Sequence, residues 1–132
     1  MQLGNVQIIG FSHIGRAEEA LIWFKRAKEI DPYFDPDWYW HRLGLTHMVL
    51  RRYDDAIQNF ERPSTREYWM AAYMAGCYAR LGTMQSALAL AAECLEKRPH
   101  FTISRWMRKE PFKDPADTAH LAACLRAAGL PE

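Results

Sequence analysis

The feature that most constrains how this chain folds is a set of three alanines that recur in similar surroundings. Ala20, Ala56 and Ala87 lie 36 and 31 residues apart, and the first two precede Phe24 and Phe60 by four positions. Self-similarity with a period of about 20–50 residues is the signature of architectures that stack one supersecondary unit repeatedly. The spacing therefore predicts one unit that the chain uses three times.

The residues between these alanines predict that each unit is helical. Gly and Pro interrupt the sequence at regular intervals, and between them apolar residues recur every three or four positions, without the alternation of a β-strand. Helices are expected near 2–13, 16–30, 37–50, 54–62, 65–81, 84–97, 103–109 and 115–128. The chain is therefore predicted to be all-α, with no sheet.

Several of the expected helix ends carry capping signals. Three helices are preceded by an acidic or hydroxyl side chain that can accept a free backbone N–H group. These residues are Asp35 before Pro36, Ser64 in the capping-box pattern Ser-Thr-Arg-Glu, and Asp114 before Pro115. Gly129, followed by Pro131, is expected to end the last helix.

Small residues at the repeated positions predict close helix crossings. Only a methyl group fits where the second helix of each pair crosses the first, and Gly44 serves the same purpose on a facing helix. A larger residue at Ala56 is expected to overpack the crossing, at a cost of about 1–3 kcal/mol. A stack of such pairs leaves its end open, and an apolar stripe on the last helix is expected to cap it. The stripe consists of Leu121, Cys124, Leu125 and Ala128, with Asp117, His120 and Arg126 mostly off it.

The repeated small and aromatic residues, such as Ala20 with Phe24 and Ala56 with Phe60, resemble those of the tetratricopeptide repeat family over about residues 1–101. The resemblance implies an α-solenoid of three helical hairpins, near 1–34, 37–66 and 68–101, with capping helices in 102–132, all in a single domain of residues 1–132. The tail, with Pro-Phe-Lys-Asp-Pro-Ala-Asp at 111–117 and Cys-Leu-Arg-Ala-Ala-Gly-Leu-Pro-Glu at 124–132, resembles the C-terminal end of certain bacterial multidomain signalling proteins. In those proteins a class III adenylate/guanylate cyclase domain precedes a tetratricopeptide segment.

The family resemblance also implies where a partner binds. The first helices of successive hairpins line a concave groove that holds a protein or peptide segment, or a neighbouring domain of the same parent protein. Projected onto that arrangement, the groove residues are Asn5, Ile9, Ser12, His13, Trp38, His41, Leu45, Met48, Trp69, Ala72, Gly76 and Arg80. Trp38 and Trp69 are the expected aromatic anchors, and the alternative is that either packs beneath the neighbouring hairpin or a cap helix. The groove lacks the Lys/Asn cluster of chaperone-binding members, for which Arg80 alone is no substitute.

Composition excludes other classes of function. The 132-residue chain has a net charge of +1, so no overall field recruits nucleic acid or an anionic membrane. No apolar run reaches the roughly 20 residues that a membrane helix requires, and the N-terminus lacks the basic residues of a signal peptide. Cys77, Cys94 and Cys124 are predicted to be reduced, buried thiols. We therefore expect a cytoplasmic protein that neither binds nucleic acid nor inserts into a membrane.

No pattern in the sequence points to catalysis. His41 and His47 are six residues apart and do not form a zinc-protease pair, and no phosphate-binding Gly-rich loop occurs. We predict no catalytic residue, metal or cofactor. Arg105-Trp106-x-Arg108-Lys109 combines positive charge with an aromatic ring and could bind phosphate, as a weaker interpretation.

Two functional hypotheses follow. The first is a non-catalytic protein-interaction module, acting as the regulatory region of a bacterial cyclase-like signalling protein whose catalytic domain lies outside this sequence. The second is a self-association scaffold that holds two copies of the parent protein together as a homodimer. A free-standing adaptor is a third arrangement that the sequence leaves open.

Overall fold

All regular secondary structure in the described part of the chain is α-helical. The computed structural model describes residues 14–110 and 114–132, and no strand occurs within these ranges. Its helices are α2 (Ile14–Ile30), α3 (Asp37–Val49), α4 (Tyr53–Phe60), α5 (Tyr68–Arg80), α6 (Met84–Lys97), α7 (Ile103–Lys109) and α8 (Pro115–Ala127). The all-α prediction is confirmed for these residues, and each range expected there matches one helix. The helix expected at 2–13 lies outside them.

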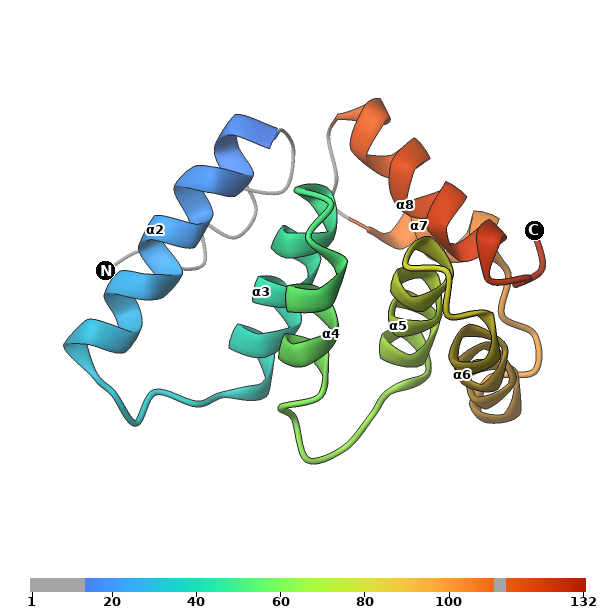
Figure 1. Cartoon of the computed structure of the whole chain (residues 1–132), viewed down its shortest axis with the longest axis horizontal. Helices are drawn as coiled ribbons and strands as arrows, with labels where there is room; N and C mark the ends of the chain where they lie inside the picture. Colours follow the sequence, from blue (N-terminus) through green and yellow to red (C-terminus); the bar gives the residue numbers. More distant parts are fainter. Residues whose placement is uncertain (1–13, 111–113) are drawn as a thin grey trace.

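Helices that are neighbours in sequence are also neighbours in space (Figure 1). From α3 to α6, each helix packs against the one before it. As a result, α3 with α4 and α5 with α6 form hairpins that lie side by side. The chain then turns back, and α8 packs against α5 and touches α3, while α7 packs against α8. This order of contacts is compatible with stacked repeats, and the tetratricopeptide assignment itself stays a prediction.

The small residues that mark the repeats lie at the helix crossings. Ala20, Ala56 and Ala87 have no exposed surface. A Cβ atom added to Gly44 would lie 2.7 Å from Cε1 of Phe60, closer than real Cβ contacts come. The prediction of a close approach between the two helices of this hairpin is therefore confirmed: Gly44 leaves the space that the Phe60 ring fills.

Two of the predicted caps are wrong. The carboxylate of Asp35 accepts the indole N–H of Trp40, and α3 begins after Pro36 without a side-chain cap. Ser64 is exposed in a loop, and α5 begins three residues later than its capping box predicts. In the same loop, Arg66 forms two hydrogen bonds to Glu93 on α6, at 2.6 and 2.9 Å.

The signals around the last helix are mostly confirmed. Asp114 accepts the backbone N–H of Ala116 at 2.9 Å, with Pro115 at the first helical position. The stripe of Leu121, Cys124, Leu125 and Ala128 is completely buried. Asp117 was expected off the stripe, but it is 5% exposed and therefore buried. The stripe also packs on α5 rather than on the outermost helix of the stack, α6, whose Leu88 remains 56% exposed.

Three helices end in the same backbone motif. After the last turn, one residue takes a positive φ, and its N–H group and the following one donate back to carbonyls of that turn. These residues are Arg51 after α3 (φ 62°), Gly82 after α5 (φ 83°) and Gly129 after α8 (φ 86°). A side chain in this region is strained by contact between its Cβ and the backbone, so Arg51 holds a position that favours glycine.

Replacing Gly44 tests the close crossing. We expect Gly44→Ala to lower the free energy of unfolding by about 1–3 kcal/mol, although alanine is the better helix former, because its methyl group meets the Phe60 ring. The measurement is urea unfolding followed by circular dichroism. In a Phe60→Leu background the two closest ring atoms are gone, and Gly44→Ala should cost less. Equal costs in the two backgrounds would contradict this account.

Replacing Arg51 tests the strained helix end. We expect Arg51→Gly to raise the free energy of unfolding by about 1 kcal/mol, because glycine removes the Cβ contact at positive φ. The variant loses a hydrogen bond from Arg51 to the carbonyl of Val49, 3.0 Å long, which makes the gain a lower bound on the strain. Arg52→Gly is the matched control, since it removes the same charge at a residue with φ −99°. A gain of equal size at Arg52 would show that charge, and not strain, is responsible.

Candidate functional site: a hollow between α3, α5 and α7

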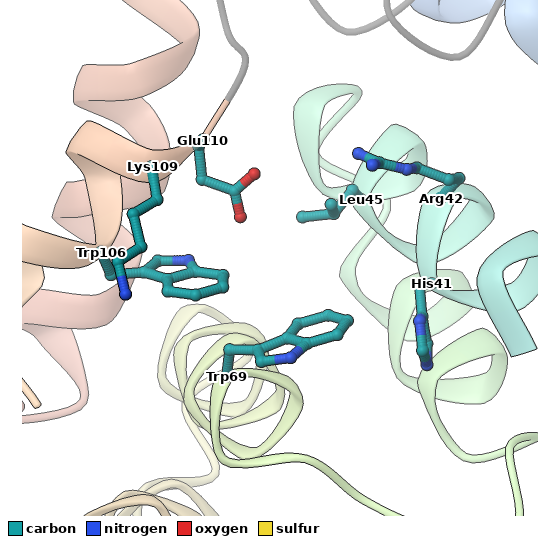
Figure 2. Close-up of a pocket in the computed structure, with 7 residues that line it drawn as sticks. All are labelled: His41, Arg42, Leu45, Trp69, Trp106, Lys109 and Glu110. Carbon is teal, nitrogen blue, oxygen red and sulfur yellow. The ribbon is translucent and has the colours of Figure 1, made fainter. Parts of the chain in front are cut away.

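One hollow of about 270 Å³ opens between three helices that lie far apart in the sequence. Figure 2 shows side chains of α3 on one side, facing α7 and the residue after it on the other, with α5 between them. The hollow is lined by His41, Arg42, Leu45, Trp69, Trp106, Lys109 and Glu110. Its wall therefore combines apolar and aromatic surface with both signs of charge.

Two stacked indole rings form the floor of the hollow (Figure 2). The rings of Trp69 on α5 and Trp106 on α7 are nearly parallel, with an interplanar angle of 10° and centroids 5.9 Å apart. His41 on α3 meets Trp69 edge-on, with centroids 4.7 Å apart. These contacts fix one ring against the other, and the partly buried rings give the hollow an aromatic lining that suits an apolar side chain.

A buried hydrogen-bond chain holds Trp106 in place. The indole Nε1–H of Trp106 donates to the Tyr73 hydroxyl at 2.8 Å, and that hydroxyl donates to the carboxylate of Glu110. Tyr73 has no exposed surface, and burial raises its pKa well above the ordinary value. Burial also raises the pKa of Glu110, against the opposing effects of the Tyr73 hydrogen bond and the positive charge of Arg42. The orientation of the stacked pair therefore depends on one fully buried hydroxyl.

The predicted groove residues divide into three groups. Asn5, Ile9, Ser12 and His13 lie outside the described residues. His41, Leu45 and Trp69 come together at the hollow. The other five lie elsewhere: Met48, Ala72 and Gly76 are buried in the core, Arg80 is exposed at the end of α5, and Trp38 is 38% exposed against Phe34. The expectation of a continuous open groove across α3 and α5 therefore needs correction.

The reason is that α8 of the same chain covers part of that face. A Cβ atom added to Gly76 would lie 3.1 Å from the backbone and from Cβ of Cys124 on α8. Gly76 was predicted to face a partner, but it instead lets the two helices come close. The part of this face that lies next to Lys109 of α7 is not covered by α8, and it forms the hollow.

Polar contacts join α8 to the second hairpin. The Tyr53 hydroxyl lies 3.1 Å from Nε2 of His120, and Sγ of Cys124 lies 3.8 Å from the same nitrogen. Burial, and then the positive charges of Arg51 and Arg80, lower the pKa of His120. Burial raises the pKa of Tyr53 to about 12. This cluster therefore favours the neutral form of His120 and of Tyr53.

Four residues that line the hollow were not predicted from the sequence to belong to one site. Arg42 lies next to a predicted groove residue, and Trp106 and Lys109 lie in the basic cluster that was considered for phosphate. Glu110 carried no signal. What could have linked them is the concentration of aromatic residues in Tyr68, Trp69, Tyr73 and Trp106, whose rings contact one another. Their pairing depends on where α7 packs, which no local pattern encodes.

The cysteines show no sign of an activated nucleophile. Cys77, Cys94 and Cys124 are free and buried, as predicted. Burial raises the pKa of all three thiols, to about 11 for Cys94, so that each is protonated at neutral pH.

Two further features concern residues 14–110 and 114–132. Among them, no three His, Cys, Asp or Glu side chains come together in a way that would hold a metal ion. Of the helices described there, none combines the length and the apolar character that crossing a bilayer requires.

Comparisons with known proteins assign no family to the chain. No model of a known protein family matches it, and a search of curated proteins finds none that is significantly similar. What the chain does must therefore be argued from its own residues.

The His120 cluster predicts a loss of stability in acid. Because the folded state lowers the pKa of His120, the unfolded state takes up the proton first, below about pH 6.5. Stability is therefore fully present above that pH and falls as the pH drops through it. Burial lowers the pKa of His41 and the pKa of His47 as well. We expect His120→Gln to reduce the loss of unfolding free energy between about pH 7.5 and 5.5.

The measurement is urea unfolding at the two pH values. His100→Gln is the matched control, because His100 is exposed, and it should keep the pH dependence of the unmodified chain. A pH dependence that is identical with and without His120 would exclude this cluster as its source.

Proposed function

We propose that this chain is a non-catalytic protein-interaction module of tetratricopeptide-like hairpins, and that the hollow between α3, α5 and α7 receives a side chain of its partner. The observation that carries the proposal is the stacked Trp69–Trp106 pair at the floor of that hollow. Tryptophan is enriched among the residues that dominate binding energy at protein interfaces. A partner's apolar side chain placed on this surface would be removed from water on one face by two indole rings.

The size of the hollow favours a peptide over a cofactor. Its volume of about 270 Å³ is smaller than the roughly 300–1,000 Å³ of most small-molecule and cofactor sites. A site of this size holds one large side chain or a short stretch of chain. The charged groups of Arg42, Lys109 and Glu110 surround it and are suited to fixing the orientation of a peptide backbone.

The resemblance of the tail supports a regulatory role within a larger protein. We place the module in the C-terminal region of a bacterial signalling protein of the adenylate/guanylate cyclase type, where partner binding would bias a linked catalytic domain. The occupant of the hollow is then a segment of another protein or of a neighbouring domain.

Self-association is the second candidate function. Leu81, Met84 and Leu88 are between 41% and 56% exposed, and they lie at the turn between α5 and α6 and on α6 itself. Exposed apolar side chains grouped in this way are typical of contact surfaces between subunits. This surface is separate from the hollow. Substitutions in the hollow should therefore affect peptide binding, and substitutions on this surface should affect self-association.

The test is the effect of Trp69→Ala on peptide binding. A random peptide display library is panned against the protein, and the affinity of a selected, labelled peptide is measured by fluorescence anisotropy. We expect Trp69→Ala to weaken binding at least about tenfold, which corresponds to about 1.4 kcal/mol. Trp38→Ala is the matched control, because Trp38 lies on α3 but does not line the hollow, and it should bind normally.

Circular dichroism establishes whether each variant is folded, and Trp69→Phe serves as a milder change if Trp69→Ala is not. A peptide that loses binding in Trp38→Ala but not in Trp69→Ala would place the interface outside the hollow. Failure to select any peptide, together with a mass that increases with protein concentration, would favour the self-association scaffold.

A further inference from the structure

A second, smaller hollow adjoins the first and is lined by positive charge. It has a volume of about 70 Å³ and lies between the start of α5, the turn after α6, and α7. The charged or ionisable side chains in its wall are Arg98, His100, Arg105 and Lys109, and no acidic residue lines it. Trp106 and Lys109 line both hollows, so the two are adjacent.

The cations of this second hollow are held in place by the fold. The guanidinium of Arg98 lies over the ring of Tyr68, 4.4 Å from its centroid. The guanidinium of Arg105 donates to the backbone carbonyl of His100 at 3.4 Å. Arg98 thus keeps a positive charge at the rim without an acidic partner, stabilised by the face of an aromatic ring.

Three carboxylates on the elements around this hollow have partners of their own. Glu132 lies near α7, since its backbone carbonyl accepts from Ser104, but its carboxylate forms two hydrogen bonds to Arg126, at 2.5 and 3.0 Å. Glu110 accepts from Tyr73 inside the first hollow. Glu93 on α6 is paired with Arg66 and Lys97. Glu132 and Glu93 are therefore neutralised by their basic partners, and Glu110 lines the first hollow and not the second.

Charge along the sequence is divided in the same way. Residues 97–109 contain five Lys or Arg and no Asp or Glu, whereas the whole chain has a net charge of only +1. The rest of the chain is therefore net negative. A long polyanion such as nucleic acid would meet repulsion outside this short segment, whereas a peptide with a few acidic residues would touch only the positive part.

We infer that the partner segment is acidic: it places an apolar side chain on Trp69 and Trp106 in the first hollow, and an adjacent Asp or Glu carboxylate between Arg98 and Arg105 in the second. This inference rests on the proposed function, because it adds a charged position to the same peptide site. Lys109, which lies between the two hollows, contacts the peptide at both positions.

The test uses peptides selected by panning a random display library against the protein. The frequency of Asp and Glu in the selected sequences is compared with that in the unselected library. The best peptide is then labelled and compared with its Asn/Gln counterpart by fluorescence anisotropy. We expect acidic residues to be enriched next to an aromatic or aliphatic one, and the Asn/Gln peptide to bind about tenfold more weakly.

The matching change in the protein is the double variant Arg98→Gln, Arg105→Gln. It should bind the acidic peptide about tenfold more weakly while binding the Asn/Gln peptide as the unmodified protein does. The matched control is Lys25→Gln with Arg26→Gln, which removes two exposed charges on α2, one of them also over a ring, that of Trp23 at 5.5 Å. The control should bind both peptides normally.

The outcomes separate this inference from the proposed function. Selected peptides that depend on Trp69 but show no enrichment in Asp or Glu would overturn the acidic partner and leave the interaction module standing. A library that yields no binding peptide would overturn both. A labelled single-stranded DNA could bind more tightly than the acidic peptide, through Arg98. That result would overturn the proposal of a peptide partner in favour of nucleic acid. Equal loss in the double variant and in the control would show a general effect of charge and overturn the second hollow as a site.

Discussion

The close packing of α8 on α5 depends on the missing side chain at Gly76. Because nothing projects from α5 at that point, α8 comes to 3.1 Å from where a Cβ atom would lie, and the two helices pack in direct contact. With α8 in place, α7 is held beside α5, and Trp106 lies against Trp69. A side chain at this position would require the backbone of α8 at Cys124 to give way by a few tenths of an ångström.

The helices themselves were predictable, because their signals are local. The three- and four-residue spacing of apolar residues and the alanines at 20, 56 and 87 depend only on nearby sequence, and the structure places helices and crossings where they predict. The errors arise from contacts that the local pattern does not encode. The Asp35 carboxylate accepts from the Trp40 indole instead of capping α3, and the approach of α8 to Gly76 buries a residue that the repeat pattern assigns to the groove.

The same aromatic residues serve both the fold and the candidate site. Tyr73 stacks on Phe60 in the core and also orients Trp106 through its hydroxyl group. Tyr68 packs against Phe101 and carries the guanidinium of Arg98 on its face. Changes to these rings therefore alter stability and recognition together. The charged side chains at the rim are different, because their removal affects the outer surface and leaves the aromatic packing in place.

The parallel indoles of Trp69 and Trp106 have a spectroscopic consequence. Two identical chromophores whose centroids are 5.9 Å apart share their electronic excitation, and the coupling depends steeply on the separation and angle of the rings. The pair contributes a paired positive and negative band to the ultraviolet circular dichroism to the extent that the two transition dipoles are skewed, and parallel dipoles contribute none. A partner that turns either ring therefore changes this contribution, and the change can be followed without any attached dye.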